Sequence, residues 1–161
     1  MMTKSDVYAL LDQKGISYKR IDHAPVFTIE DMEAAGVCQY GNVCKNLFLR
    51  NGSGKRHFLV CVQKDKTVDL KQLGALLGSR MSFASEERLQ KYLGLTPGAV
   101  TPLGILNDKN AEVEVVIDSD LASEPSLGVH PCENTATIFL NFADLKKLIE
   151  DHGNPITYCS L

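Results

Sequence analysis

The chain has 161 residues, of which 44% are hydrophobic and 23% are charged, and its net charge is −3. This length fits one domain that buries its own core, so we expect a single domain over residues 1–161. No apolar run approaches the ~18 residues of a membrane span, and the first residues lack the pattern of a signal peptide. We therefore expect no membrane association and a cytoplasmic location. The acidic balance argues against a protein that grips duplex DNA, but not against one that contacts a single end of an RNA.

The five cysteines predict neither a disulfide framework nor a zinc site, because their number is odd and no pair has C-x-x-C spacing. They are Cys38, Cys44, Cys61, Cys132 and Cys159. We expect them to be reduced and mostly buried, as small apolar side chains. The sequence offers no metal-ligand spacing, and we expect neither a metal nor a cofactor.

The first half of the chain predicts two helices and three strands. Thr3 and Thr28 each precede an Asp three residues later, which resembles a capping box and indicates a helix start. Gly15 and Gly36 are the expected helix ends. Strands are expected at 16–21, 47–50 and 57–62, and the last two flank Asn51-Gly52-Ser53-Gly54, which is typical of a hairpin.

The second half predicts three helices, each opened by a capping residue and closed by a glycine. They begin after Asp69, Ser85 and Asn141 and end at Gly78, Gly94 and Gly153. Strands are expected at 112–117, 135–140 and 156–159, the last at a sheet edge, and 103–106 is a candidate partner of 112–117. The pattern predicts an α/β fold in which helices surround a mixed, largely antiparallel sheet.

Lys45 and Asn46 stand at the mouth of an apolar strand. A lysine is almost never fully buried without a partner, so one interpretation is a side chain that reaches solvent from a strand end. The other is a fixed cation beside a pocket, able to polarise a carbonyl or stabilise an oxyanion.

Residues 95–104 contain two prolines and two glycines, which build a stiff loop with unusual backbone angles. The segment is either a connector or a loop that presents backbone groups to a small ligand. The candidate ligand-binding residues are Gly98, Ala99, Val100, Thr101 and Pro102.

His130 and Asn134 flank the proline turn that begins at Pro131. In one interpretation Asn134 caps local backbone. In the other, His130 shapes a pocket and Asn134 hydrogen-bonds a substrate.

Together, Lys45-Asn46, Gly98-x-x-x-Pro102 and His130-Pro131-x-x-Asn134 resemble the YbaK/ProX family of aminoacyl-tRNA editing domains. The resemblance covers nearly the whole chain, including 22–28, 45–49 and 93–101, and is greatest to the free-standing alanyl-tRNA(Pro) deacylases. One departure is Gly128-Val129, where we expect a bulkier aromatic side chain before the histidine.

The resemblance implies hydrolysis of an aminoacyl ester at the 3′-terminal adenosine of mischarged tRNA, most simply Ala-tRNA(Pro). An ester of this kind is already activated, so positioning and an oxyanion stabiliser suffice. Lys45 is the expected catalytic residue, Asn46 and Asn134 the hydrogen-bonding groups, and His130 a wall or gate. The implied partners are the acceptor end of tRNA(Pro) and, as a further candidate, prolyl-tRNA synthetase.

Three alternatives remain open at this point. The first is a Cys-tRNA(Pro) deacylase of the same family. The second is a non-catalytic module that binds an amino acid or an aminoacyl-tRNA. The third is a cysteine hydrolase that pairs Cys44 or Cys132 with His130, although no acidic orienting residue is identifiable.

Overall fold

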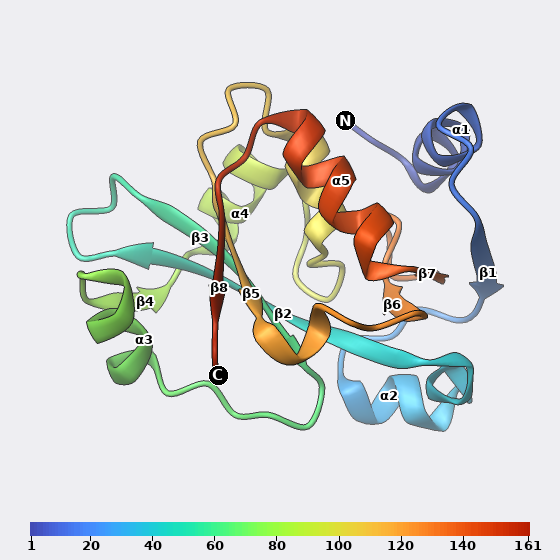
Figure 1. The fold of residues 1–161 in the computed structure, drawn as a ribbon, viewed down its shortest axis with the longest axis horizontal. Coiled ribbons are helices and arrows are strands. Elements are labelled where there is room, and N and C mark those ends of the chain that lie inside the picture. The colour runs from blue at the N-terminus through green and yellow to red at the C-terminus, as the bar shows by residue number, and fades with distance from the viewer.

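The computed structural model describes residues 1–161 and contains one eight-stranded mixed sheet in the order β1-β7-β6-β2-β3-β5-β8, with β4 paired to β2 (Figure 1). The strands are β1 (Tyr18–Asp22), β2 (Asn42–Asn51), β3 (His57–Gln63), β4 (Met81–Phe83), β5 (Glu114–Asp118), β6 (Leu127–Val129), β7 (Ala136–Leu140) and β8 (Ile156–Cys159). The α-helices are α1 (Lys4–Gln13), α2 (Ile29–Ala34), α3 (Leu70–Leu77), α4 (Glu86–Leu93) and α5 (Phe142–His152). Three 3-10 helices complete the fold: η1 (Val37–Tyr40), η2 (Pro102–Asn107) and η3 (Ser119–Leu121). No helix is long and apolar enough to cross a bilayer.

The α-helices begin at the predicted residues, because a polar side chain satisfies free N–H groups in each first turn. Thr3 and Thr28 form complete capping boxes with Asp6 and Asp31. The other three helices are capped by the side chains of Asp69, Ser85 and Asn141.

The strand pairings confirm a mixed sheet in which four pairings are antiparallel and three are parallel. The predicted β2–β3 hairpin is present, and β8 is an edge strand that runs parallel to β5. β2 begins at Asn42 rather than at residue 47. β4 and β6 were not predicted, because three residues are too few to show an alternating pattern.

The expectation that 103–106 forms a strand beside 112–117 is wrong. These residues belong to η2, and β5 pairs instead with β3 and β8. The Thr101 hydroxyl accepts the N–H of Leu103, and Pro102 occupies the first turn, so the local sequence starts a helix there. Because η2 is buried along residues 102–105, its apolar side chains Leu103 and Ile105 have the spacing that a strand would also show.

The sheet is covered on both faces, as the alternation of side chains along its strands requires. Helices α1, α4 and α5 share the main core with the inner face of the sheet, which includes Phe48, Leu59 and Ile117. On the opposite face α3 packs on Leu49, Val60, Val62 and Val116. A third, smaller cluster joins α2 to Val43 and Phe139. In Figure 1, α2 lies beside the first residues of β2, and α3 lies near the other end of that strand.

Along one side of β2 the strand pairing is interrupted, and this interruption leaves part of β2 open. On that side β6 pairs with Asn42 and Val43, whereas β4 pairs only from Leu49 onward. Residues 44–47 therefore pair with β3 alone. This open stretch of β2 carries the Lys45-Asn46 pair.

Candidate active site

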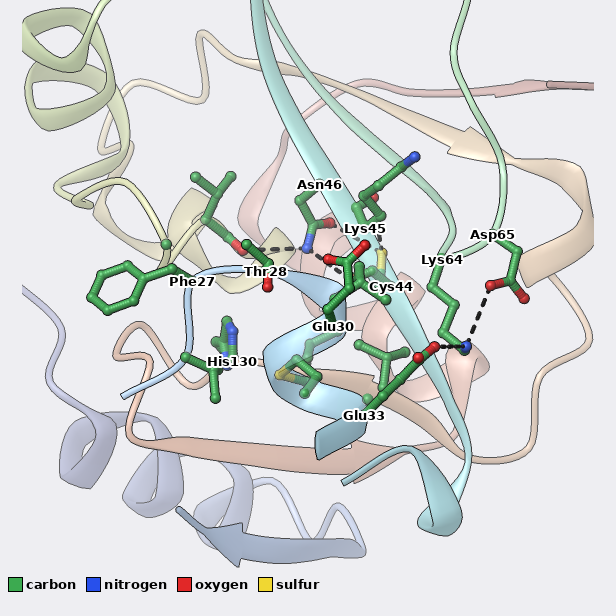
Figure 2. A pocket seen from close by; sticks show the side chains of 18 of the residues that line it. Phe27, Thr28, Glu30, Glu33, Cys44, Lys45, Asn46, Lys64, Asp65 and His130 are labelled. Atoms are coloured by element: carbon green, nitrogen blue, oxygen red, sulfur yellow. Dashed lines mark hydrogen bonds and ion pairs between the residues drawn. The ribbon is translucent and has the colours of Figure 1, made fainter. Parts of the chain in front are cut away.

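A cavity of about 700 Å³ lies at the open stretch of β2, beneath α2 (Figure 2). Its walls come from five segments far apart in the sequence: 26–33, 43–46, 64–67, 98–100 and 128–130. Of the residues singled out in the sequence, the structure brings together Lys45, Asn46, Gly98, Val100 and His130 around this space.

Asn46 joins β2 to the glycine-proline loop. Its Nδ2 donates to the carbonyl of Val100 at 3.2 Å and to that of Cys44 at 3.4 Å. The Cys44 thiol donates to Asn46 Oδ1 at 3.0 Å. The Asn46 amide is thus oriented by protein groups on both its nitrogen and its oxygen.

Lys45 leaves β2 on the face opposite to Asn46, because successive side chains of a strand alternate. Both residues nevertheless line the cavity. The Lys45 ammonium donates one hydrogen bond to the main-chain carbonyl of Lys66, in the loop that follows β3. An ammonium has three N–H groups, so two remain for a ligand.

The loop from Gly98 to Pro102 turns its first residues toward the cavity and its last toward the core. Gly98 has φ +87°, and a Cβ there would lie 2.6 Å from Cδ1 of Phe27, so a larger residue would be strained and would displace that ring. Ala99, Thr101 and Pro102 are buried behind the loop and do not line the cavity.

Thr101 links this loop to the histidine segment. Its hydroxyl donates to the main-chain carbonyl of His130 at 2.6 Å and accepts the N–H of Leu103 at 3.3 Å. Thr101 has no exposed surface, so both bonds are shielded from water. Its place in the structure is that of a support behind the site.

The His130 ring forms a fixed wall of the cavity. Its Nδ1 lies 2.9 Å from the carbonyl of Ala136, which can only accept, so Nδ1 carries the proton and Nε2 is left as an acceptor in the neutral ring. Burial lowers the pKa of His130 below its ordinary value, and the nearby His23 adds to this effect. The ring is therefore held neutral and in one tautomer.

Gly128 explains the departure from the expected aromatic side chain. A Cβ at this position would lie 2.7 Å from Cε1 of Phe139, on the neighbouring strand β7. The ring of Phe139 thus already occupies the space beside Gly128.

Asn134 does not line the cavity. The side-chain Nδ2 of Asn134 donates to the main-chain carbonyl of Val26 at 2.9 Å. The main-chain carbonyl of Asn134 accepts the N–H of Val26 at 3.3 Å. Asn134 therefore anchors the segment that leads into α2.

Sequence reasoning missed a group of charged side chains at the rim. Lys64 Nζ lies 2.7 Å from Glu33 of α2 and 3.3 Å from Asp65 (Figure 2). These ion pairs, that to Glu33 first, raise the pKa of Lys64. The signal was available, because Lys64-Asp65-Lys66 directly follows the apolar strand β3.

The thiols are arranged as small core side chains. All five are free, and all but Cys38 are buried. Burial raises the pKa of Cys44 well above its ordinary value and that of Cys132 to about 12. A nucleophilic cysteine needs the opposite shift, so this arrangement argues against the cysteine hydrolase. The structure also contains no group of three or more His, Cys, Asp or Glu side chains placed to hold a metal ion.

Comparisons with known proteins agree with this arrangement. A family model described as the aminoacyl-tRNA editing domain matches residues 23–148. The chain is 49% identical over 155 residues to the Prolyl-tRNA editing protein ProX of Acetoanaerobium sticklandii, which covers 96% of this chain and 94% of that protein. It is 33% identical to the Prolyl-tRNA synthetase associated domain-containing protein 1 of Danio rerio, over 92% of this chain and 82% of that one.

A solved structure shares the fold. It is that of a protein proposed as a trans-editing enzyme for prolyl tRNA synthetase, with a TM-score of 0.73 and 20% identity, over 96% of this chain and 94% of that one. The family model spans well over half of the present chain, and the identity to the bacterial editing protein extends over almost all of it. The chain therefore belongs to the family of aminoacyl-tRNA editing domains.

Proposed function

We propose that this editing enzyme acts in trans on mischarged tRNA(Pro), and that its principal substrate is Ala-tRNA(Pro). The observation that carries the proposal is the cavity itself, which is lined by Lys45, by Val100 with its carbonyl bonded to Asn46, and by the neutral ring of His130. Its volume of about 700 Å³ falls in the usual range of small-molecule sites. The names of the two curated relatives support a role in proline decoding.

In the proposed reaction, water adds to the ester carbonyl carbon and the bond to the 3′ oxygen of the terminal ribose breaks. The Lys45 ammonium, with two free N–H groups, stabilises the negative charge that develops on the carbonyl oxygen. The neighbouring ribose hydroxyl, as the family resemblance implies, orients the water and relays its proton to the leaving oxygen. The products are the free amino acid and tRNA with both ribose hydroxyls intact.

The carbonyl of Val100 and the ring of His130 hold the aminoacyl group. The Val100 carbonyl accepts only one bond, from Asn46, so it keeps a lone pair for a ligand N–H. His130 Nε2 is likewise an acceptor. These two hydrogen-bond acceptors suit an amino acid that carries a protonated α-amino group.

Selection by size explains why such an enzyme is needed. A proline-activating site gains only ~1–3 kcal/mol against a smaller side chain, so alanine is accepted at a measurable rate. A second site that admits alanine and excludes the prolyl ring completes a double sieve. We assign the excluding wall to His130.

The partner we propose is the acceptor end of tRNA(Pro) rather than a long stretch of duplex. A chain with a net charge of −3 has little capacity for many phosphate contacts. Association with a prolyl-tRNA synthetase is a further proposal, suggested by the name of the second relative.

The test is hydrolysis by the purified protein of tRNA(Pro) charged separately with alanine, cysteine, serine or proline. Alanine should be released fastest and proline should remain. Faster release of cysteine would assign the chain to Cys-tRNA(Pro). Binding of every substrate without release would make it a non-catalytic module. Adding prolyl-tRNA synthetase to the same assay tests the association.

A further inference from the structure

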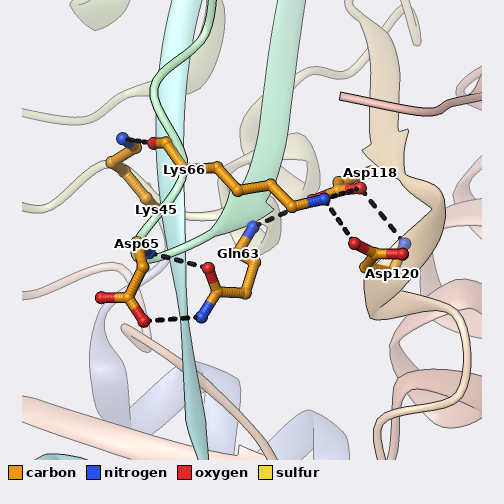
Figure 3. A network of polar contacts seen from close by, with 6 residues as sticks. All are labelled: Lys45, Gln63, Asp65, Lys66, Asp118 and Asp120. Carbon is orange, nitrogen blue, oxygen red and sulfur yellow. Dashed lines mark hydrogen bonds and ion pairs between the residues drawn. The ribbon is translucent and has the colours of Figure 1, made fainter.

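The carbonyl that accepts the Lys45 hydrogen bond belongs to Lys66, whose own side chain is fixed by two carboxylates (Figure 3). Lys66 Nζ lies 2.8 Å from Asp118 Oδ2 and 2.5 Å from Asp120 Oδ2. The Asp118 side chain is 1% exposed, whereas that of Asp120 is 70% exposed. Asp118 is therefore the buried anchor of this arrangement.

Asp118 is a built feature of the sheet. It ends β5, which runs parallel to β3, and its carboxylate also accepts the N–H groups of Gln63 at 3.3 Å and Asp120 at 3.2 Å. Burial alone would raise the pKa of Asp118, but the bond from Lys66 and these N–H groups bring it below its ordinary value. A buried carboxylate is stable only with such partners.

Apart from the ion pair between Lys64 and Glu33 of α2, the loop that carries the Lys66 carbonyl is held by few bonds. It runs from the end of β3 at Gln63 to the start of α3 at Leu70 without regular structure. One turn bond joins the Lys66 N–H to the Gln63 carbonyl at 3.1 Å, and Asp65 exchanges two bonds with the Gln63 side chain. The side chain of Lys66 is held separately, by the ion pairs of its ammonium with Asp118 and Asp120.

We propose that Asp118 and Lys66 are positioning residues for hydrolysis: Asp118 fixes the Lys66 side chain, the Lys66 carbonyl is thereby held in place, and that carbonyl aims the Lys45 ammonium. The inference rests on the proposed function of Lys45. It adds two residues, Asp118 and Lys66, whose charged groups pair with each other and which we place behind Lys45 (Figure 3).

The first test replaces Lys66 by methionine, which keeps the apolar stem and removes the ammonium. Because a displacement of about 1 Å can reduce a rate by about 100-fold, kcat on Ala-tRNA(Pro) should fall about 10- to 100-fold. KM should stay within about twofold, since the ammonium that is removed is paired with Asp118 and Asp120 rather than with the substrate. Asp118→Asn should act in the same direction, and Lys66→Arg should restore most of the lost kcat.

A matched control is Glu114→Gln at the other end of β5. It removes the ion pair between Glu114 and Arg56, whose closest atoms are 2.8 Å apart, and should leave kcat unchanged. Circular dichroism and thermal melting of every variant separate misplacement of Lys45 from loss of folded protein. A rise of KM at unchanged kcat would overturn the proposal, because it would make Lys66 a substrate-binding residue.

The decisive measurement is a double-mutant cycle with Lys45→Ala. If Lys66 acts through Lys45, then Lys66→Met should cause no further loss of kcat in the Lys45→Ala protein. Losses that multiply in the double variant would show an independent structural effect and would reject the inference.

A readout without activity keeps this inference separate from the proposed function. Nitrogen-15 NMR of the lysine ammonium groups should show a shifted or broadened Lys45 signal in Lys66→Met and Asp118→Asn, but not in Glu114→Gln. An unchanged Lys45 signal in the first two variants would refute the positioning role. Changed signals in a protein that hydrolyses none of the charged tRNAs would reject the proposed function and leave the coupling in place.

Discussion

Lys45 is the residue on which the proposed chemistry depends most directly. In the proposed mechanism Lys45→Ala removes the two N–H groups that would bind the substrate carbonyl oxygen, so deacylation should fall by a factor of about 100 to 1,000, as for other lost oxyanion donors. The melting temperature should change little, because the side chain is only half-buried and makes one hydrogen bond. Hydrolysis rates and thermal melting together check both statements.

Lys55→Ala is the control for this variant, since Lys55 is exposed on the β2–β3 loop and remote from the cavity. It should match the unmodified protein in both measurements. A well-folded Lys45→Ala protein with near-normal turnover would contradict the proposed catalytic role of Lys45.

His130 should control which amino acid is removed. His130→Ala opens a wall of the cavity, so larger aminoacyl groups should gain relative to alanine, while the rate on alanine falls through looser positioning. Because burial keeps the His130 pKa low and the ring neutral, the acid side of the pH profile should be the same in the variant. The measurement is hydrolysis of Ala-, Ser- and Pro-tRNA(Pro) across pH.

A general base at this position makes the opposite prediction. Every substrate would lose rate by the same factor, and the variant would lose the titration step that His130 contributes to the profile. If the substrate ranking is unchanged and the titration step of His130 is missing, His130 does not act as a gate.

At the scale of elements, Thr101 holds η2 and the glycine-proline loop against the histidine segment. Thr101→Val keeps the shape but leaves the His130 carbonyl and the Leu103 N–H without their buried partner. Unfolding free energy should fall by about 1–3 kcal/mol, and hydrolysis should slow because Val100 and His130 lose their common support. Urea unfolding and deacylation rates measure the two effects.

Thr101→Ser is the matched control, because it retains the hydroxyl. It should recover most of both losses. A Thr101→Val protein as stable as the unmodified one would show that the two buried groups find other partners.

His57 connects the β2–β3 hairpin to α4 and should make that junction sensitive to acid. Its ring lies between Phe48 and Tyr92, and Nε2 accepts a bond from Arg88 at 2.9 Å. Burial first, and then the charge of Arg88, lowers the pKa of His57 to about 4. An unfolded chain binds this proton near pH 6.5, whereas the folded chain binds it only near pH 4.

The free energy of unfolding should therefore fall as the pH drops from about 6.5 to about 4, by at most about 3 kcal/mol from this group. Above about pH 6.5 both states are unprotonated, and the contribution to stability is complete. His57→Phe should lack this part of the pH dependence. Urea unfolding of both proteins at several pH values isolates the difference, and parallel curves would contradict the prediction.

At the scale of the whole molecule, the four buried cysteines should be inert in the folded state. Burial raises the pKa of Cys44, Cys132 and Cys159, so little thiolate exists near neutral pH. Treatment with iodoacetamide, or with EDTA, should leave deacylation unchanged, and urea should make all five thiols reactive. Loss of activity in step with alkylation of one buried cysteine would revive the cysteine hydrolase.

The helices were predictable because their signals are local. A capping side chain and the N–H groups that it satisfies lie within three residues of each other, as at Thr28 and Asp31, so no other part of the chain is needed to place the helix start. Segment 103–106 failed for the converse reason. A short apolar segment that is buried throughout fits either a strand or a 3-10 helix, and the bond between Thr101 and the Leu103 N–H favours the helix.

The sequence by itself determined the family motifs, the helix boundaries and the pairing of Lys45 with Asn46 and His130 at one site. Only the tertiary structure decided that Asn134 and Thr101 serve as supports, and that Asp118 stands behind Lys45. Those roles depend on contacts between residues 29 to 108 positions apart, which the tertiary fold brings together. A residue type shows which bonds a side chain can make, whereas the fold selects the partner that receives them.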